Sequence, residues 1–350
     1  LATPVALAAG LNKAARNHIL IRDTSALEQM RNVDVVVFDK TGTLTEGHPT
    51  VIGWLWAQGQ EDHYKDVLLA AESTSDHPLA EAIVTALEGE EQVIPAHLDG
   101  FESIAGKGVR VAYQGAEYWV GSHKLLKDYQ ANLSDILADM LTQYESDGNS
   151  IVYFGRENDL LAVIAIKDQL RVTSMEAIRE LRIQDIEICM LTGDGERTAS
   201  SVAGSLGIMR FVADAMPDDK EDFIHKLQLQ GKTVAMVGDG VNDAQALSCA
   251  DVSIAMGKGT DTLMDTAMIT LRTSDLLLLP KVFRLSRQTV SLMYRNLFWA
   301  FIYNTVGIFV AAGVLYPVYD ILLSPALAGA AMALSCVSVA LSSLRLSSRF

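Results

Sequence analysis

Cysteine and basic side chains are both scarce in this sequence. The three cysteines, Cys189, Cys249 and Cys336, are widely spaced and odd in number, so they predict no disulfide framework, and a reducing compartment is expected. Lysine and arginine together number 28 against 43 aspartates and glutamates, which gives a formal net charge of −15. Binding to nucleic acid needs clustered basic side chains that contact phosphates, so nucleic acid is excluded as an expected partner.

Charge is absent from two long segments near the carboxyl end. No residue of 296–319 or of 321–344 is charged, and about 20 helical residues span the ~30 Å hydrocarbon layer of a bilayer. The sequence therefore predicts two transmembrane helices within 296–350, joined by a tight turn and in contact with lipid. Arginines flank this hairpin and place both of its ends in the cytosol by the positive-inside rule. They are Arg284, Arg287, Arg295, Arg345 and Arg349.

The first residues lack an initiator methionine and a basic leader. An apolar segment is followed by scattered basic residues, so we expect residues 1–22 to be the end of a transmembrane helix and a stalk that reaches the cytosol. The sequence accordingly reads as one that begins inside a longer protein.

Short apolar runs alternate with helix-patterned segments over much of the chain. The expected strands are 33–38, 186–191, 233–237 and 252–256, and the expected helices are 173–182, 198–206 and 219–228. This alternation predicts an α/β fold with a doubly wound parallel sheet. In such sheets the ligand lies beyond the carboxyl ends of the strands.

A chain of 350 residues exceeds what one hydrophobic core usually organises. From residue 47 to about 166 the pattern changes, and we expect an α+β domain inserted between the first two strands of the sheet. The expected division is 1–22 for the first membrane segment and stalk, 23–46 and 167–278 for the sheet domain, 47–166 for the inserted domain, 279–295 for a second stalk and 296–350 for the membrane hairpin.

Polar residues follow the predicted strands. Asp39 comes directly after the first strand, and a carboxylate among backbone N–H groups and hydroxyls suits attack on a phosphoryl group. Asp239 and Asp243 follow another strand and offer the oxygen ligands that Mg²⁺ requires. Thr192 offers a hydroxyl to phosphate oxygens, and Lys220 can neutralise charge on a transferred phosphoryl group. Each residue alone is also common in turns or on surfaces, so it is their joint presence that favours a phosphoryl-transfer site.

Four motifs carry a resemblance to a known family. DKTGTLT (39–45), TGD (192–194), MPDDK (216–220) and GDGVND (238–243) together resemble the phosphorylation domain of P-type ATPases, with similarity over nearly the whole chain. The resemblance is to the heavy-metal branch, and most of all to bacterial copper(I)-exporting ATPases.

This resemblance implies a HAD-like (haloacid dehalogenase-like) fold and an aspartyl phosphate formed from ATP at Asp39. It implies Mg²⁺ held by Asp39, the Thr41 carbonyl and Asp239, and a phosphate held by Thr192 and Lys220. The other residues that it places in the active site are Lys40, Gly193, Asp194, Asn242 and Asp243.

Thr41 bears on the choice between a pump and a phosphatase of the same fold. Soluble phosphatases of this fold normally carry an aspartate two residues after the nucleophile as general acid and base, and Thr41 stands at that place. A longer-lived phosphoenzyme is therefore expected, as a pump requires. A membrane-anchored phosphatase, and a regulatory fragment that binds nucleotide without being phosphorylated, remain alternatives.

The inserted segment contains a second resemblance. Its segment ESTSDHPLA (72–80) is similar to the nucleotide-binding signature of the heavy-metal P-type ATPases, and the expected ATP contacts are Glu72, His77, Gly106, Gly108 and Gly121. A histidine before proline is also a common helix start, and isolated glycines are common in turns.

Two residues lie where the sheet domain resumes. Asp168 and Arg171 resemble the hinge element of the family, and a surface ion pair is the alternative.

The transported ion is predicted from the final two helices, which contain no carboxylate. Sulfur ligands suit Cu⁺ or Ag⁺, whereas Zn²⁺ and hard divalent ions normally require carboxylates in the membrane. The expected ion-binding residues are Tyr303, Asn304, Met332, Ser335 and Cys336. Copper exporters more often have serine at the last of these positions, so both Cu⁺ and Ag⁺ are expected as candidate ions. A divalent Zn²⁺-type pump is the alternative function. Packing between helices is the alternative role for the methionine.

The family also implies parts that this sequence does not contain. A Cys-Pro-Cys element and an actuator domain are expected before Leu1, together with further transmembrane helices. The resemblance implies a bacterial inner membrane with the catalytic domains in the cytosol, and it allows a copper chaperone as a further partner.

Overall fold

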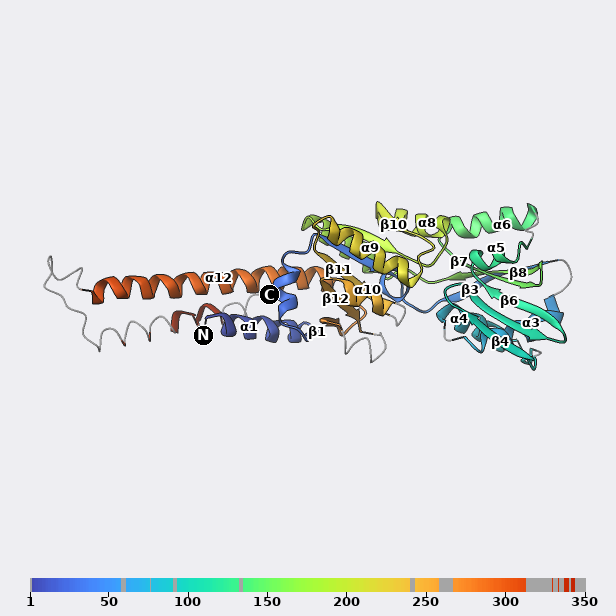
Figure 1. Ribbon diagram of the computed structural model, residues 1–350, viewed down its shortest axis with the longest axis horizontal. Helices are drawn as coiled ribbons and strands as arrows, with labels where there is room; N and C mark the ends of the chain where they lie inside the picture. The colour runs from blue at the N-terminus through green and yellow to red at the C-terminus, as the bar shows by residue number, and fades with distance from the viewer. Residues whose placement is uncertain are drawn as a thin grey trace.

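The structure is a computed structural model. It describes residues 2–57, 61–75, 77–90, 93–131, 135–239, 243–257 and 267–312, and in addition 329, 333, 337–339 and 341–343. Figure 1 shows three parts in a row. They are the pair of helices α1 (Ala2–Arg16) and α12 (Leu278–Ala311), a sheet covered by helices, and a second sheet with its own helices.

The central part is a seven-stranded sheet. Its strands, in spatial order, are β1 (Ile19–Ile21), β13 (Ile269–Leu271), β12 (Val252–Met256), β11 (Val234–Gly238), β2 (Val35–Asp39), β9 (Glu187–Leu191) and β10 (Arg210–Val212). All neighbours are parallel except β1, which runs antiparallel to β13. Every residue of β2, β11 and β12 is buried, as expected of strands covered on both faces.

Alternate side chains of β2 enter different cores. Val36 and Phe38 pack in one apolar core with five helices, and Val35 and Val37 pack in another with two helices. The helices of the first core are α1 (Ala2–Arg16), α2 (Ser25–Met30), α7 (Ser174–Ile183), α8 (Glu196–Leu206) and α12 (Leu278–Ala311), and those of the second are α9 (Pro217–Leu229) and α10 (Ala244–Cys249). The predicted doubly wound parallel sheet is therefore confirmed.

The second sheet is antiparallel and has six strands. In spatial order they are β3 (Thr50–Trp56), β8 (Asp159–Lys167), β7 (Ser150–Arg156), β6 (Ala116–Gly121), β5 (Gly108–Tyr113) and β4 (Gly100–Ile104). Helices α3 (Glu61–Glu72) and α4 (Pro78–Glu88) share one core with it, and α5 (His123–Asp128) and α6 (Asp135–Ser146) share the other. The chain enters this sheet after β2 and returns to the first sheet at β9.

Helix α1 (Ala2–Arg16) lies beside α12, as Figure 1 shows. The two pack closely at Gly10, where a Cβ atom would lie 2.6 Å from Thr289 Oγ1. Helix α12 continues through the predicted boundary between 295 and 296, and most of the predicted second membrane helix lies outside the described residues. Over the residues with a described position, no helix combines the length and the apolar composition needed to cross a membrane.

Candidate active site

Three neighbouring strands of the seven-stranded sheet end at the same place. Asp39 is the last residue of β2, and β9 and β11 lie on either side of it and are followed by Thr192 and Asp239. Asp39 is 6% exposed and Thr192 is 2% exposed. The parallel order of the strands therefore brings Thr192 and Asp239 beside Asp39, which precedes them in the chain by 153 and 200 residues.

Lys220 lies between two carboxylates of this site. From α9 its Nζ donates to Asp39 Oδ1 at 2.5 Å and to Asp243 Oδ1 at 2.7 Å. Burial by itself would lower the pKa of Lys220, but attraction to these two carboxylates outweighs burial and raises that pKa above its usual value. The lysine therefore remains charged beside the predicted nucleophile.

Three aspartates form a compact oxygen cluster. Carboxylate oxygens of Asp39, Asp239 and Asp243 lie within 4.8 Å of one another. Burial, and then repulsion by the other two carboxylates, raise the pKa of Asp239 to about 7. Such a set of oxygens, with more negative charge than Lys220 neutralises, fits a hard divalent cation such as Mg²⁺.

The loop after Asp39 requires a glycine. Gly42 has a φ of +69°, and a Cβ atom there would lie 1.5 Å from Asp239 Oδ2. Its N–H donates to Thr45 Oγ1 at 2.9 Å, and the same hydroxyl lies 2.5 Å from Asp168 Oδ2. Gly42 and Thr45 were not among the predicted site residues, although the DKTGTLT motif contains both.

Asp168 and Arg171 both bind this loop. Arg171 is 8% exposed, donates from Nε to the Thr43 carbonyl at 3.0 Å and also donates to the Gly42 carbonyl. Asp168 Oδ1 accepts from the Gly47 N–H at 3.1 Å. The pair therefore supports the loop after Asp39 and does not form the surface ion pair considered as the alternative.

Lys40 is directed to the second sheet. It forms a buried ion pair with Asp194, and its Nζ donates to Ser150 Oγ at 3.2 Å. Ser150, the first residue of β7, donates to Asp194 Oδ1 at 2.8 Å, and Thr192 Oγ1 donates to Oδ2 at 3.0 Å. Burial favours a higher pKa for Asp194, but the Lys40 charge outweighs it and holds that pKa below its usual value. A Cβ atom added to the adjacent Gly193 would lie 3.8 Å from the Ala215 carbonyl oxygen, which is an ordinary contact distance.

Ser150 was missed by the sequence reasoning. It lies in the inserted segment, outside every recognised motif, so nothing in its sequence context indicates a contact with Lys40 and Asp194.

The predicted nucleotide residues occupy two places beside the second sheet. Glu72 ends α3, is 6% exposed, and has a pKa raised to about 7 by burial. His77 precedes α4, and its Nδ1 accepts from the Leu79 N–H at 3.2 Å, so it caps that helix. Both residues therefore border the turn between α3 and α4.

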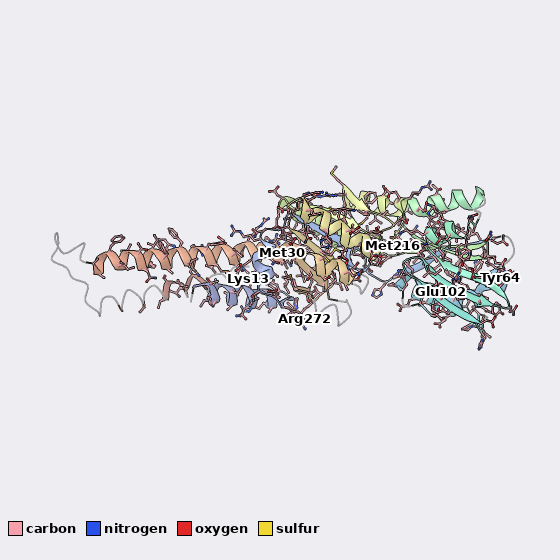
Figure 2. The ribbon with its side chains drawn as sticks, viewed as in Figure 1. Lys13, Met30, Tyr64, Glu102, Met216 and Arg272 are labelled. Carbon is pink, nitrogen blue, oxygen red and sulfur yellow. The ribbon has the colours of Figure 1, made fainter. Side chains whose placement is uncertain are left out.

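The predicted nucleotide glycines have close neighbours of their own. Gly108 and Gly121 are partners across β5 and β6, and a Cβ atom on either would lie 2.1 Å from a backbone carbonyl oxygen. A Cβ atom on Gly106 would lie 2.2 Å from the end of the Met216 side chain, which Figure 2 labels. Strand pairing and this contact with Met216 are sufficient physical reasons for glycine at all three positions.

The predicted ion-binding residues are only partly described. Tyr303 and Asn304 lie on α12, where Tyr303 is 46% exposed and Asn304 Nδ2 donates to the Ala300 carbonyl at 2.8 Å. Three predicted ion ligands and one predicted active-site residue lie outside the described residues. They are Met332, Ser335, Cys336 and Asn242.

Comparison with known proteins identifies the family. The family model for haloacid dehalogenase-like hydrolases matches residues 33–251. The chain is 42% identical over 346 residues to a copper-exporting P-type ATPase of Legionella pneumophila, and 43% identical over 351 residues to a silver-exporting P-type ATPase of Salmonella typhimurium. These alignments cover 99% of the chain, but only 47% and 42% of the two relatives, so the chain spans less than half of either.

A solved structure gives the same result. The crystal structure of a zinc-transporting PIB-type ATPase in an E2.Pi state matches 99% of this chain and 55% of its own, with a TM-score of 0.68 and 35% identity. The predicted resemblance and fold class are confirmed. The chain belongs to the haloacid dehalogenase-like hydrolase family, and over 99% of its length it is similar to P-type ATPases.

Proposed function

We propose that this chain is the catalytic portion of an ATP-driven pump that exports Cu⁺ or Ag⁺ through an aspartyl phosphate at Asp39. The observation that carries the proposal is the Lys220 ammonium group between Asp39 and Asp243, with Asp239 beside them. Transfer of a phosphoryl group needs positioning and positive charge more than covalent chemistry from the protein, and this arrangement supplies both.

In the proposed reaction a carboxylate oxygen of Asp39 attacks the γ-phosphorus of ATP. An oxygen–phosphorus bond forms while the bond from phosphorus to the bridging oxygen breaks, and ADP leaves with that electron pair. Lys220 neutralises charge on the transferred group, and the Thr192 hydroxyl binds one of its oxygens. Asp39, Asp239 and the Thr41 carbonyl are the proposed holders of Mg²⁺, which when bound neutralises phosphate charge.

Thr41 supports a durable phosphoenzyme. A threonine hydroxyl at this position is a far weaker base than a carboxylate, so water attacking the aspartyl phosphate receives no general base from it. This favours a pump over the alternative of a membrane-anchored phosphatase, because a pump changes conformation while the phosphate is attached.

Glu72, His77, Gly106, Gly108 and Gly121 remain the proposed contacts of ATP. Glu72 and His77 support this by bordering one turn, and a carboxyl group with a pKa near 7 can be protonated and donate a hydrogen bond.

The proposed cargo site lies in a bacterial inner membrane, with the catalytic domains in the cytosol. Support comes from the copper- and silver-exporting relatives and from the outer part of α12, which exposes large apolar side chains. Those side chains are Leu297, Phe298, Trp299, Phe301, Val306, Ile308 and Phe309. Tyr303, Asn304, Met332, Ser335 and Cys336 are the proposed ion ligands, because sulfur favours soft monovalent ions.

The complete pump is proposed to need further partners. Removal of the phosphate is assigned to an actuator domain of the same pump, ion entry to further transmembrane helices, and delivery of the ion to a copper chaperone.

A zinc pump is the second candidate, since the structural neighbour transports zinc. ATPase activity of the complete pump, measured with Cu⁺, Ag⁺ and Zn²⁺ in turn, separates the two candidates. Stimulation by Cu⁺ or Ag⁺ supports the proposal, and stimulation by Zn²⁺ alone refutes it.

Phosphorylation is tested with ATP labelled at the γ-phosphate. An acid-stable label on the wild-type protein is expected, and Asp39→Asn should abolish it because an amide is no nucleophile for phosphorus. Asp159→Asn, which changes the exposed first residue of β8, is the matched control and should retain the label. A label that survives Asp39→Asn would overturn the assignment.

A further inference from the structure

A cluster of three different metal-ligating side chains lies outside the phosphorylation site. Glu221 and His225 are one turn apart on α9, and Cys249 is the last residue of α10. The Cys249 Sγ lies 3.4 Å from Glu221 Oε1, and the His225 Nε2 lies 3.5 Å from the same oxygen. All three donor atoms lie within 4.8 Å of one another on partly or fully exposed residues. We propose that these side chains bind a divalent metal ion of the zinc class.

The donor set and its spacing both fit zinc. Zinc binds cysteine sulfur at about 2.3 Å and histidine nitrogen or carboxylate oxygen at about 2.0–2.2 Å in a tetrahedron, so its ligand atoms lie ~3.3–3.6 Å apart. The two distances to Glu221 Oε1 fall in this range. Mg²⁺ and Ca²⁺ prefer oxygen ligands throughout, and Cu⁺ gains little from a carboxylate. Three protein ligands leave the fourth zinc position open to water.

Gln228 contacts two of the proposed ligands, His225 and Cys249, and can orient them. Its Oε1 lies 3.1 Å from His225 Nδ1, and its Nε2 donates to the Cys249 carbonyl at 2.9 Å. When Nδ1–H of His225 donates to Gln228, the lone pair of Nε2 is free for a metal ion. A hydrogen bond to the second ring nitrogen is the usual support of a metal-binding histidine.

A bound ion would join two helices that position the phosphorylation site. Lys220 directly precedes Glu221 on α9, and Asp243 directly precedes α10. The ion therefore acts as a clamp that holds the lysine and the aspartate of the Lys220–Asp243 ion pair together. This consequence rests on the proposed function, whereas binding of the ion does not.

The test is a titration of the whole chain with Co²⁺, which takes the same ligands as zinc and absorbs in the near ultraviolet when bound to thiolate. We expect a thiolate-to-cobalt band that Zn²⁺ removes by competition. Loss of a second-shell partner commonly costs about 10–100-fold in affinity, so loss of a ligand in Cys249→Ser or His225→Ala should cost at least about 100-fold. His97→Ala changes an exposed histidine elsewhere in the chain and should leave the titration unchanged.

A missing band, or a band that persists in both Cys249→Ser and His225→Ala, would overturn the site. Binding of Cu⁺ without binding of Co²⁺ or Zn²⁺ would overturn the divalent assignment. Asp39→Asn removes phosphorylation but should keep the cobalt band, so failure of the metal site and failure of the proposed function give different results.

Discussion

Replacing Glu72 with glutamine should make the stability of the protein less dependent on pH. Burial at the end of α3 raises the pKa of Glu72 from 4.5 to about 7 in the folded chain. One pKa unit corresponds to ~1.36 kcal/mol, so ionising this side chain in the folded state costs about 3 kcal/mol. The full stability is present below the unfolded pKa, and this amount is lost as pH rises through the folded pKa. A glutamine does not ionise, so the variant avoids the loss.

Urea unfolding at several pH values, followed by tryptophan fluorescence, measures this effect, because the second sheet contains the buried Trp119. The free energy of unfolding of Glu72→Gln, relative to wild type, should increase by about 3 kcal/mol between roughly pH 4 and pH 8. Glu88→Gln, at the exposed end of α4, is the control and should follow the wild-type curve. If the free energy of unfolding changed with pH by the same amount in Glu72→Gln and in wild type, the reasoning would be refuted.

Three further substitutions test the proposed phosphorylation site. Gly42→Ala places a methyl group on Asp239 at a positive φ and should abolish phosphate labelling, while Gly115→Ala, which also has a positive φ but no atom within 4 Å of the added Cβ, should retain it. Lys220→Met breaks a buried ion pair and should lower the free energy of unfolding by about 3–5 kcal/mol. It should also abolish the phosphate label. A variant that is labelled and as stable as wild type would contradict the site. Ser150→Ala removes the hydroxyl between Lys40 and Asp194 and should lower the free energy of urea unfolding by about 1 kcal/mol, and an unchanged midpoint would show that this contact does not matter.

The central strands of the first sheet could be predicted because they are buried on both faces. Continuous apolar runs mark β2, β9, β11 and β12, and the 252–256 strand has the predicted bounds. The strands β1, β10 and β13 have three residues each, too few for a pattern to indicate them. The predicted domain boundaries stay predictions.

The motifs indicated which residues gather around Asp39, but several of their contacts could not be predicted. Lys40 binds Asp194 and Ser150 because the second sheet packs against the first, and a linear sequence does not contain that arrangement. Arg171 is buried where it donates to the carbonyls of Gly42 and Thr43. Its sequence context alone also fits a surface residue. The proposed roles of the site residues stay predictions.

The most direct test of the account is to identify the phosphorylated residue itself. Borohydride reduces an aspartyl phosphate to homoserine, so protein incubated with ATP and Mg²⁺, reduced and digested, can be analysed by peptide mass spectrometry. The account predicts homoserine at position 39, in the peptide that contains DKTGTLT. Homoserine at another aspartate, or its absence from position 39 in a complete pump that hydrolyses ATP, would contradict it.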